Sequence, residues 1–334
     1  MAQVSSTKAL KILLYLLLAA TTAAAAEEGG AQAPPYDLVV AQDGSGDYAT
    51  IQEAVSSVRD YRPEGETRIL IRRGVYREKL VIPANKTHIT LVGEDVAETI
   101  ITHGDHANMN RMGTFKTYTL LVLGSDFRAE NLTIENSAPQ LGQAVAVHVE
   151  GDRAVFARCR LLGNQDTLFT GNGDSRQLYH RCYIEGTTDF IFGPATAWFE
   201  QCTIRSKKSS YITAASTPAG REVGYVLHRC TLTADSAAEQ VYLGRPWRAH
   251  AAVLFMRCSL GAHIRPAGWH NWGDPQRELT ARYAEFQNTG PGADTTQRVP
   301  WARQLTPQEA ARYTPESALQ GCDGWTGWQG VMDN

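Results

Sequence analysis

The sequence predicts an all-β solenoid, a parallel β-helix in which every coil adds short strands to a stack. The first observation is a phrase centred on a cysteine, which occurs at residues 157–161, 180–184, 200–204, 228–232 and 255–260. Residues 131–134 open the series, and from Asn131 through the successive cysteines the steps are 28, 23, 20, 28 and 28 residues. Such a recurring phrase is typical of a solenoid, because each coil buries its apolar side only against its neighbours.

The second observation is the pattern inside each phrase. The cysteine and the apolar residue two positions later share one face of a short strand, and polar residues occupy the other face. No unit contains a long helical stripe. A leucine-rich horseshoe would fit the period, but its leucine-rich consensus is absent, so we favour strands stacked ~4.8 Å apart.

The first 26 residues differ from the rest of the chain. Lys8 and Lys11 precede an apolar run at 12–20, and small residues follow as far as Ala26. This order predicts a signal peptide over residues 1–26, followed by a single domain over residues 27–334. A membrane anchor is the alternative, but it would need about 20 apolar residues. We therefore expect a secreted monomer, extracellular, in a cell wall or in a periplasm, without membrane contact after the signal is removed.

The next segments predict a cap and the first strands. Residues 50–58 follow a glycine-rich turn and have helical spacing. A solenoid end exposes strand edges and needs a cap, so we predict an N-terminal capping helix there. Residues 68–71 and 88–92 are short β-forming runs that continue the stack toward the N-terminus.

Six cysteines in a secreted protein would ordinarily suggest disulfides. Five of them hold equivalent inward positions, which favours a ladder of free thiols packed as small apolar side chains. Adjacent coils also satisfy the Cα separation of about 4.4 to 6.8 Å that a bridge requires, and Cys182 and Cys202 are the pair we select for one. The two possibilities stay open here. Cys322 lies outside the ladder, and Asn131 is expected to face inward with the cysteines.

Composition and charge limit the class of partner. The chain has 334 residues, of which 43% are hydrophobic and 20% charged, as in globular proteins. This length allows two domains, although all-β chains of ~200 to 250 residues or somewhat more often fold as one. Lys and Arg number 32 against 35 Asp and Glu, for a net charge of −3 without a basic block. Nucleic acid is therefore not an expected partner.

Two aspartates hold the same phase on consecutive coils. Asp166 follows Cys159 by seven residues, and Asp189 follows Cys182 by seven, so both should lie on one face. Neighbouring carboxylates repel when both ionise, which favours one protonated group and suits an acid and base pair. The alternative is a solvated pair or an Asp at a turn. The apolar segment 188–193 would make an unpaired carboxylate costly, so we expect a cation nearby.

Arg245, in the segment 243–247, is the candidate cation. Its planar guanidinium can hold a carboxylate with two hydrogen bonds and keep it ionised. Gln143 and Gln165 lie near the same coils and offer the uncharged amide donors that an oxyanion would require. Glutamines that only hydrogen-bond the turns of a structural β-helix are the alternative.

Several segments, in one order, resemble the pectin methylesterase family. They are residues 74–78, 143–146, 163–168, 189–193 and 243–247, supported by 43–47 and 266–269. The resemblance covers nearly the whole mature chain and implies a right-handed parallel β-helix. No helical inhibitor-like segment precedes the catalytic domain, so the chain resembles the single-domain form of the family.

The resemblance also implies an activity and roles for the residues. The activity is hydrolysis of the C6 methyl esters of galacturonosyl units in pectin to methanol and carboxylates, with no metal and no other cofactor. Asp189 matches the nucleophile, and Asp166 matches the acid that protonates the departing methanol and then acts as base. Gln143 and Gln165 match the oxyanion donors.

Three further residues match substrate contacts of the family. Arg245 matches the residue that orients the nucleophile and contacts substrate, Trp247 matches a stacking aromatic, and Thr114 resembles a substrate-contacting threonine. His148 and Pro194 depart from the residues common at their positions. These departures flank the motifs and bear on substrate subsites rather than on the reaction.

Two other classes of function fit parts of the pattern. A glycoside hydrolase could place two carboxylates about 5 to 5.5 Å apart, close to the spacing of adjacent coils. A noncatalytic polysaccharide-binding β-helix could use Trp247, Trp269 and Trp272 as sugar platforms. Methanol without new reducing ends indicates the esterase, new reducing ends indicate the hydrolase, and pectin binding without methanol indicates the binding module.

Overall fold

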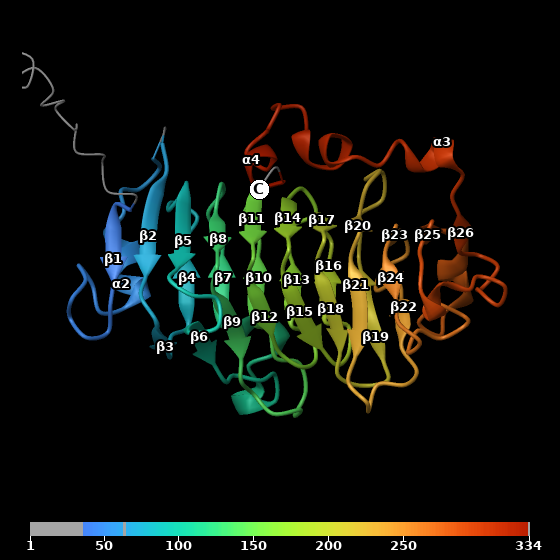
Figure 1. Cartoon of the computed structure of the whole chain (residues 1–334), viewed down its shortest axis with the longest axis horizontal. Helices are drawn as coiled ribbons and strands as arrows, with labels where there is room; N and C mark the ends of the chain where they lie inside the picture. The colour runs from blue at the N-terminus through green and yellow to red at the C-terminus, as the bar shows by residue number, and fades with distance from the viewer. Residues whose placement is uncertain (1–35, 63–64, 333–334) are drawn as a thin grey trace, which may run out of the picture. The chain divides into compact units, whose positions relative to one another are not determined.

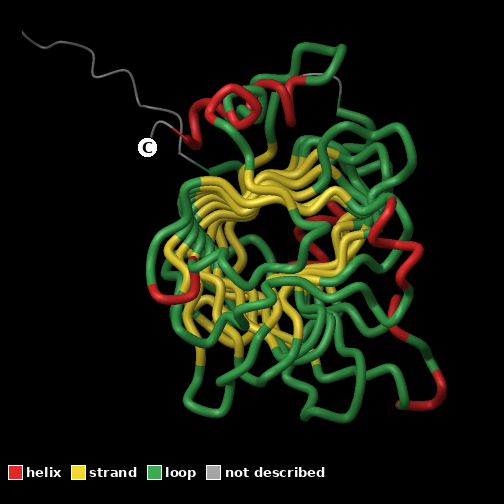
Figure 2. Tube along the Cα trace, turned by 90° about the vertical axis from the view of Figure 1, so that its right-hand side faces the viewer, coloured by secondary structure: helices red, strands yellow, loops and turns green. Residues whose placement is uncertain are grey.

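The computed structural model describes residues 36–62 and 65–332, which form a stack of coils (Figure 1). The predicted signal peptide lies outside the described residues. The strands form three sheets, and every strand pairing is parallel. Figure 2, viewed along the stack, shows the strands of successive coils superimposed around a common interior. The predicted parallel β-helix is confirmed.

The three sheets contain 11, 8 and 7 strands. The first sheet consists of β1 (Leu38–Val40), β2 (Thr67–Ile71), β5 (Ile89–Gly93), β8 (Arg128–Glu130), β11 (Ala154–Ala157), β14 (Arg176–His180), β17 (Thr196–Glu200), β20 (Tyr225–His228), β23 (Ala252–Met256), β25 (Arg282–Phe286) and β26 (Arg303–Gln304). The second consists of β3 (Gly74–Tyr76), β6 (Thr99–His103), β9 (Thr133–Asn136), β12 (Arg160–Leu162), β15 (Tyr183–Gly186), β18 (Thr203–Ser206), β21 (Thr231–Ala234) and β24 (Ser259–Leu260). The third consists of β4 (Leu80–Ile82), β7 (Leu120–Val122), β10 (Val147–Val149), β13 (Leu168–Thr170), β16 (Ile191–Gly193), β19 (Tyr211–Ala215) and β22 (Tyr242–Gly244).

A left-handed bend separates the first sheet from the second. The residue before each ladder cysteine has a φ between 52° and 55°. Its backbone N–H donates to a main-chain carbonyl of the next coil, as Arg158 does to His180 and Arg229 does to Met256, at 2.9 and 3.0 Å. The bend thus repeats from coil to coil and turns the following side chain toward the core.

The five ladder cysteines are free and buried, with at most 1% exposure. The thiol of Cys182 donates to the carbonyl of Phe156 at 3.3 Å, and that of Cys202 donates to the carbonyl of Tyr179 at 3.2 Å. Each thiol therefore points to the main chain of the preceding coil. The possible bridge between Cys182 and Cys202 does not form, whereas the expected ladder of free thiols does. Cys322 is free and exposed.

The expected place of Asn131 in this ladder is wrong. Strand register pairs Ile134 with Leu161, so Leu132 holds the position equivalent to Cys159 and is fully buried. Asn131 lies at the bend with a φ of 56°, where its side-chain amide donates to the carbonyl of Gly93 at 2.9 Å. The first step of the repeat is one residue shorter than the sequence suggested, and a shift by one residue reverses the face.

The predicted capping helix is α2, Ile51–Ser57. Thr50 is its N-cap, because its backbone is extended and its hydroxyl accepts a hydrogen bond from the N–H of Glu53. The carboxylate of Glu78 accepts from the first two helical N–H groups, both at 2.9 Å. The helix packs its apolar face, Ile51, Ala54 and Val55, into the core of the stack.

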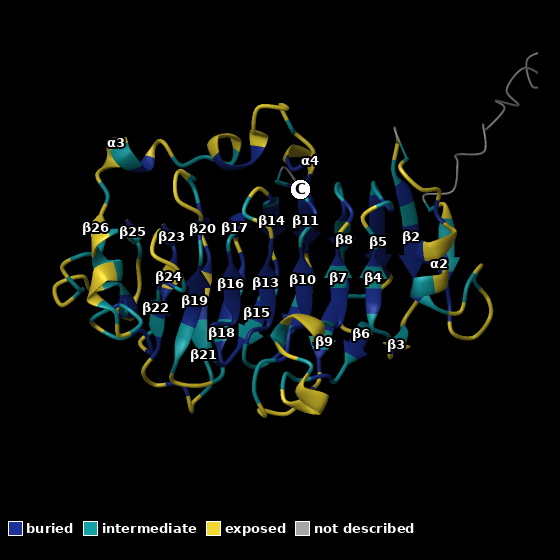
Figure 3. Cartoon of the chain, turned by 180° about the vertical axis from the view of Figure 1, so that it is seen from behind, coloured by how far each residue is buried: buried dark blue, intermediate teal, exposed yellow. Residues whose placement is uncertain are grey.

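A C-terminal segment covers the outer face of the first sheet (Figures 2 and 3). It contains α3 (Pro307–Ala310), the turn η5 (Glu316–Gln320) and α4 (Gln329–Met332). Leu319 and Trp328 pack against apolar side chains of that face. Arg176 of β14 binds Asp323 through two of its nitrogens, at 2.6 and 2.7 Å.

Short 3-10 turns complete the described elements. They are η1 (Met109–Arg111), η2 (Thr114–Lys116), η3 (Pro275–Leu279) and η4 (Pro291–Ala293). None of the helices within the described ranges has the length and apolar character needed to cross a membrane.

Candidate active site

The two predicted aspartates lie at the bend that separates the second sheet from the third. Leu168 of β13 pairs with Ile191 of β16, which puts Asp166 and Asp189 at equivalent positions on adjacent coils. Their φ values are 65° and 48°, a left-handed backbone that Asp adopts more readily than most residues. The side chains are buried, with residue exposures of 8% and 6%. The structure therefore places the two aspartates in register on adjacent coils, as predicted.

Arg245 holds the carboxylate of Asp189 from the end of β22. Its Nε donates to Oδ1 at 2.9 Å and its Nη2 donates to Oδ2 at 2.6 Å. The backbone of Arg245 is fixed by a hydrogen bond to the carbonyl of Thr213 in β19, at 2.9 Å. The predicted cation thus makes both hydrogen bonds of a bidentate pair, from a position 56 residues further along the chain.

Two aromatic rings enclose the guanidinium of Arg245. Its central carbon lies 3.8 Å from the ring centroid of Tyr211 and 3.7 Å from that of Trp272. These contacts fix the plane of the guanidinium and restrict its rotation. No sequence motif pointed to Tyr211, and Trp272 was predicted only as a sugar platform. No local pattern connects these rings to Arg245, because they belong to different coils.

The surroundings of the two carboxyl groups shift their pKa values to different extents. Burial raises the pKa of Asp166 well above its usual range, and the neighbouring charge of Asp189 raises it further. Burial also raises the pKa of Asp189, but the hydrogen bonds and charge of Arg245 oppose that effect. Both pKa values are raised, that of Asp166 more strongly, so Asp166 favours its protonated form, and Asp189 is the carboxyl group whose ionised form Arg245 stabilises.

The two predicted glutamines lie side by side next to this pair. Gln143 and Gln165 form an isolated parallel bridge between adjacent coils, and both are half-buried. A hydrogen bond from Gln165 lowers the pKa of Asp166, opposing burial. The backbone carbonyl of Gln143 accepts from the N–H of Ala107 at 2.8 Å, so the loop before β7 is tied to this coil.

Aromatic side chains extend from the site along the outer face of the third sheet. The rings of Phe169 and Phe192 are 4.8 Å apart, and Trp247 lies 5.9 Å from Phe192. Thr114 begins η2, where its neighbour Phe115 is 46% exposed and contacts Phe169 at 4.9 Å. Trp247 and Phe115, the neighbour of Thr114, therefore lie at opposite ends of this row of rings.

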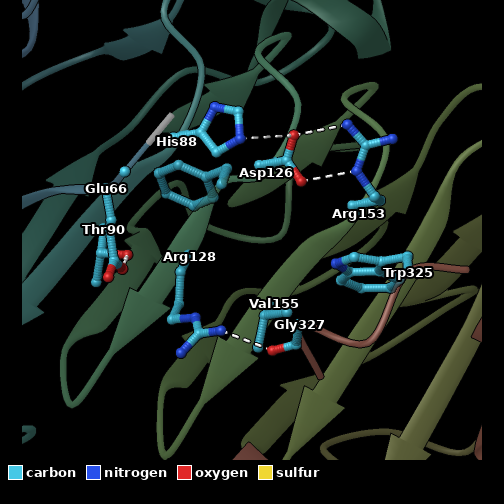
Figure 4. A pocket seen from close by; sticks show the side chains of 11 residues that line it. Glu66, His88, Thr90, Asp126, Arg128, Arg153, Val155, Trp325 and Gly327 are labelled. Carbon is cyan, nitrogen blue, oxygen red and sulfur yellow. Dashed lines mark hydrogen bonds and ion pairs between the residues drawn. The ribbon is translucent and has the colours of Figure 1, made fainter. Parts of the chain in front are cut away.

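A separate cavity lies over the outer face of the first sheet, beside Trp325 and Gly327 (Figure 4). Its volume is about 340 Å³, and none of the predicted site residues lines it. Arg153 holds Asp126 there through two nitrogens at 2.7 and 2.6 Å, and an Arg128 nitrogen donates to the carbonyl of Gly327 at 2.7 Å. The bond from Arg128 and a further bond from Arg153 to Asp323, at 3.1 Å, fasten the C-terminal segment to the sheet.

The described part of the chain contains no group of three or more His, Cys, Asp or Glu side chains arranged to hold a metal ion. The site consists instead of two carboxyl groups, one guanidinium and two amides. Such a set can supply a nucleophile, a proton donor and oxyanion donors for acyl transfer.

Known proteins resemble this chain in both sequence and fold. A family model described as Pectinesterase matches residues 37–322. The chain is 42% identical over 292 residues to Pectinesterase 31 of Arabidopsis thaliana, which covers 83% of the chain and 90% of that protein. The structure matches the pectin methylesterase from carrot with a TM-score of 0.83 and 33% identity, over 90% of this chain and 97% of that one.

A second solved structure is a pectin methylesterase in complex with a hexasaccharide. It matches with a TM-score of 0.74 and 30% identity, over 88% of this chain and 99% of that one. These matches confirm the right-handed parallel β-helix that the sequence resemblance implied. The chain belongs to the pectinesterase family.

Proposed function

We propose that the protein hydrolyses the C6 methyl esters of homogalacturonan, the methylated backbone of pectin, with Asp189 as nucleophile and Asp166 as acid and base. The proposal is carried by one observation: a buried carboxylate held by Arg245 lies in register with a second carboxyl group whose pKa is raised well above its usual range. Family membership supplies the substrate class.

The first half of the reaction forms an acyl-enzyme. The ionised carboxylate of Asp189 attacks the ester carbonyl carbon, and the amides of Gln143 and Gln165 donate to the oxyanion that develops. Asp166 gives its proton to the methoxy oxygen, so the carbon–oxygen bond breaks and methanol leaves. The products of this step are methanol, an anhydride on Asp189 and an ionised Asp166.

The second half regenerates the enzyme. The carboxylate of Asp166 takes a proton from water while the oxygen of that water attacks the substrate carbonyl of the anhydride. Collapse of the second oxyanion releases Asp189 as a carboxylate and leaves a carboxylic acid on the polymer, which gives its proton to solvent and becomes galacturonate, while Asp166 is protonated again. Arg245 neutralises Asp189 at the beginning and the end of the cycle, and the rings of Tyr211 and Trp272 hold the guanidinium in place.

Substrate binding is assigned to the aromatic surface beside the aspartates. Trp247 and Phe115 offer ring faces on which sugar rings can stack, and Thr114 is the neighbour of Phe115 at the border of that surface. The guanidinium of Arg245 reaches the same surface and would contact the substrate as well as Asp189. The hexasaccharide complex of the similar esterase supports a polymeric sugar ligand of this kind.

The decisive experiment measures methanol and reducing ends released from highly methylated pectin. We expect methanol without new reducing ends, at the same rate with and without a chelator. New reducing ends would favour a glycoside hydrolase, and loss of activity on chelation would contradict chemistry by side chains alone. Retention on pectin without methanol release would leave only a binding module.

The remaining assignments concern processing and assembly. We propose that residues 1–26 are removed during export and that residues 27–334 act as a secreted, monomeric catalytic domain. Lys8, Lys11 and the apolar run at 12–20 support the first statement. N-terminal sequencing of the exported protein should begin at or near Glu27, and light scattering should give the mass of one chain.

A further inference from the structure

Four arginines form a column along the bend between the first and second sheets. Arg158, Arg181, Arg229 and Arg257 each precede a ladder cysteine, and Gln201 takes the same place on the coil between the two pairs. All five residues are exposed. Register between β11, β14, β17, β20 and β23 puts them on successive coils, which lie next to one another in Figure 1.

The backbone at this bend does not require arginine. A left-handed conformation favours Gly, Asn and Asp over long side chains. The equivalent bends elsewhere carry Asn131, Gln201 and Gln287, with φ values of 56°, 53° and 49°. A neutral side chain thus completes the same turn, so the positive charge of the column is not explained by folding.

Arg181 donates from its Nε to the side-chain oxygen of Gln201 at 3.2 Å, and the other three arginines of the column have few acidic partners among the described residues. Arg229 forms no ion pair or side-chain hydrogen bond within the described residues, and Arg257 lies 5.7 Å from the ring of Phe286. Arg158 meets one carboxylate, Glu130, at 3.5 Å, and 44% of its side chain remains exposed.

The flanking rows do not supply the missing acids. On the second sheet, the outward residues beside the column are Arg160, Tyr183, Thr203, Thr231 and Ser259, none of them acidic. On the first sheet, Glu200 is the acid that precedes Gln201, but it is 3% exposed and already pairs with His228 at 2.8 Å. The charge of the column therefore faces solvent.

We propose that this arginine column binds linear polyuronate, the de-esterified stretches of homogalacturonan. The inference rests on the proposed function, because that reaction turns a neutral polymer into one with a carboxylate on each sugar. The strand spacing of ~4.8 Å separates neighbouring positions of the column, and the four coil steps span roughly 19 Å. One sugar of an extended polyuronate is about as long as one coil step. The spacing of the arginines along the column therefore matches the spacing of the carboxylates along the polymer. Each Arg can also bind a carboxylate with two hydrogen bonds.

The column and the catalytic pair lie at different bends of the coil. Asp166 and Asp189 follow the second sheet, whereas the column precedes it. A long pectin chain could contact both, with a de-esterified stretch on the column and an esterified stretch at the aspartates. Binding at the column would then raise the local concentration of ester groups near the two aspartates without changing the rate of the chemical step.

The test replaces Arg158, Arg181, Arg229 and Arg257 together by Gln, the residue that position 201 already carries. A matched control replaces four exposed arginines off the column, Arg59, Arg73, Arg303 and Arg312, by Gln. Binding to fully de-esterified polygalacturonate is measured at low ionic strength, about 50 mM salt, where exposed charges are least screened. We expect the column variant to bind about tenfold more weakly or worse, and the control to stay close to wild type.

Three readouts decide the outcome. Equal binding by the column variant and the control would overturn the proposal, and so would equally strong binding of double-stranded DNA by the wild type. Wild-type binding should also weaken as salt rises, and thermal melting should show both variants folded. Turnover of a short methyl-esterified oligogalacturonate, too short to reach the column, should be unchanged in the column variant. If the wild type turned over no ester while the column variant still lost pectate binding, the proposed reaction would fail and the column would stand.

Discussion

Two bends of the coil contain left-handed backbone, and they use that geometry differently. Before the second sheet, five successive coils place a residue with φ near 53° and then a fully buried cysteine. Before the third sheet, two coils place Asp166 and Asp189 at the left-handed residue itself. The first bend repeats a packing unit, and the second carries the two carboxyl groups that we propose to be catalytic.

The difference lies in the free energy of burial. A neutral thiol can be buried with one carbonyl as acceptor, so every coil can repeat it without help from elsewhere. A buried carboxylate needs a counter-charge and hydrogen bonds, which Asp189 receives from Arg245. The bend with the aspartates therefore depends on distant coils, whereas the ladder depends only on its neighbours.

The largest effect should follow from removing the nucleophile. Asp189→Asn keeps the size of the side chain but removes the attacking carboxylate, so kcat should fall by about 10⁴-fold or more. Methanol release from pectin measures this, with circular dichroism as the check on folding. A variant that keeps a tenth of wild-type turnover would remove Asp189 from the nucleophile role.

Asp166→Asn should remove the group that we propose as acid and base. The variant can still attack but cannot protonate methoxide or activate water, a loss of about 10² to 10⁴-fold. An ester with a better leaving group than methoxide should partly rescue the first half-reaction in Asp166→Asn and not in Asp189→Asn. Pre-steady-state kinetics separate the two, and rescue in the opposite variant would exchange the roles.

Arg245→Lys tests the bidentate grip. Lysine keeps the charge but loses the planar fork and the stacking between Tyr211 and Trp272, so kcat should fall by roughly 10²-fold. The KM for pectin should also rise if the guanidinium contacts substrate. Near-normal turnover in this variant would show that Arg245 holds Asp189 without contributing to catalysis.

The stability of Asp166→Asn should depend on pH. In the folded protein the pKa of Asp166 is raised, so ionising the group costs folding free energy as pH rises through that value. Asparagine has no such cost, and the variant should be more stable than wild type by roughly 0.5 to 2 kcal/mol at neutral and alkaline pH. Urea unfolding should show the gap closing below about pH 4, where the carboxyl group is protonated in both states. A gap that stayed constant with pH would contradict the raised pKa.

Replacing one cysteine of the ladder should have the smallest effect, a small loss of stability. Cys202→Ala removes one buried thiol and should lower the free energy of unfolding by about 1 kcal/mol, with kcat unchanged. Thermal melting and methanol release measure the two quantities. A loss of activity comparable to that of the aspartate variants would mean that the two bends are not independent.

Local repetition explains which parts of the fold were predictable. The cysteine phrases place the coils, and the seven-residue offset from Cys159 and Cys182 correctly puts Asp166 and Asp189 in register. The same reasoning failed at Asn131, because the first unit lacks a cysteine and its alignment was one residue out. Periodicity locates a coil more surely than it locates the face of one residue.

Long-range contacts were outside the reach of the pattern. The rings of Tyr211 and Trp272 meet on Arg245 from segments with no shared repeat. Arg176 meets Asp323 across 147 residues, which places the C-terminal segment on the first sheet. Neither contact can be predicted from the spacing of residues, because a local sequence pattern does not indicate which distant segment packs against it.

The sequence by itself determined the stack of coils, the inward thiols, the two aspartates in register and the resemblance to one family. These features depend on periods of two residues within strands and some 20 to 28 residues between coils, which are written locally in the chain. The tertiary structure alone decided which carboxyl group Arg245 binds, which rings enclose the guanidinium, and that the arginines of the repeated phrase face solvent as one column. Those properties arise from burial and from distances between residues on different coils, and such distances exist only once the chain has folded.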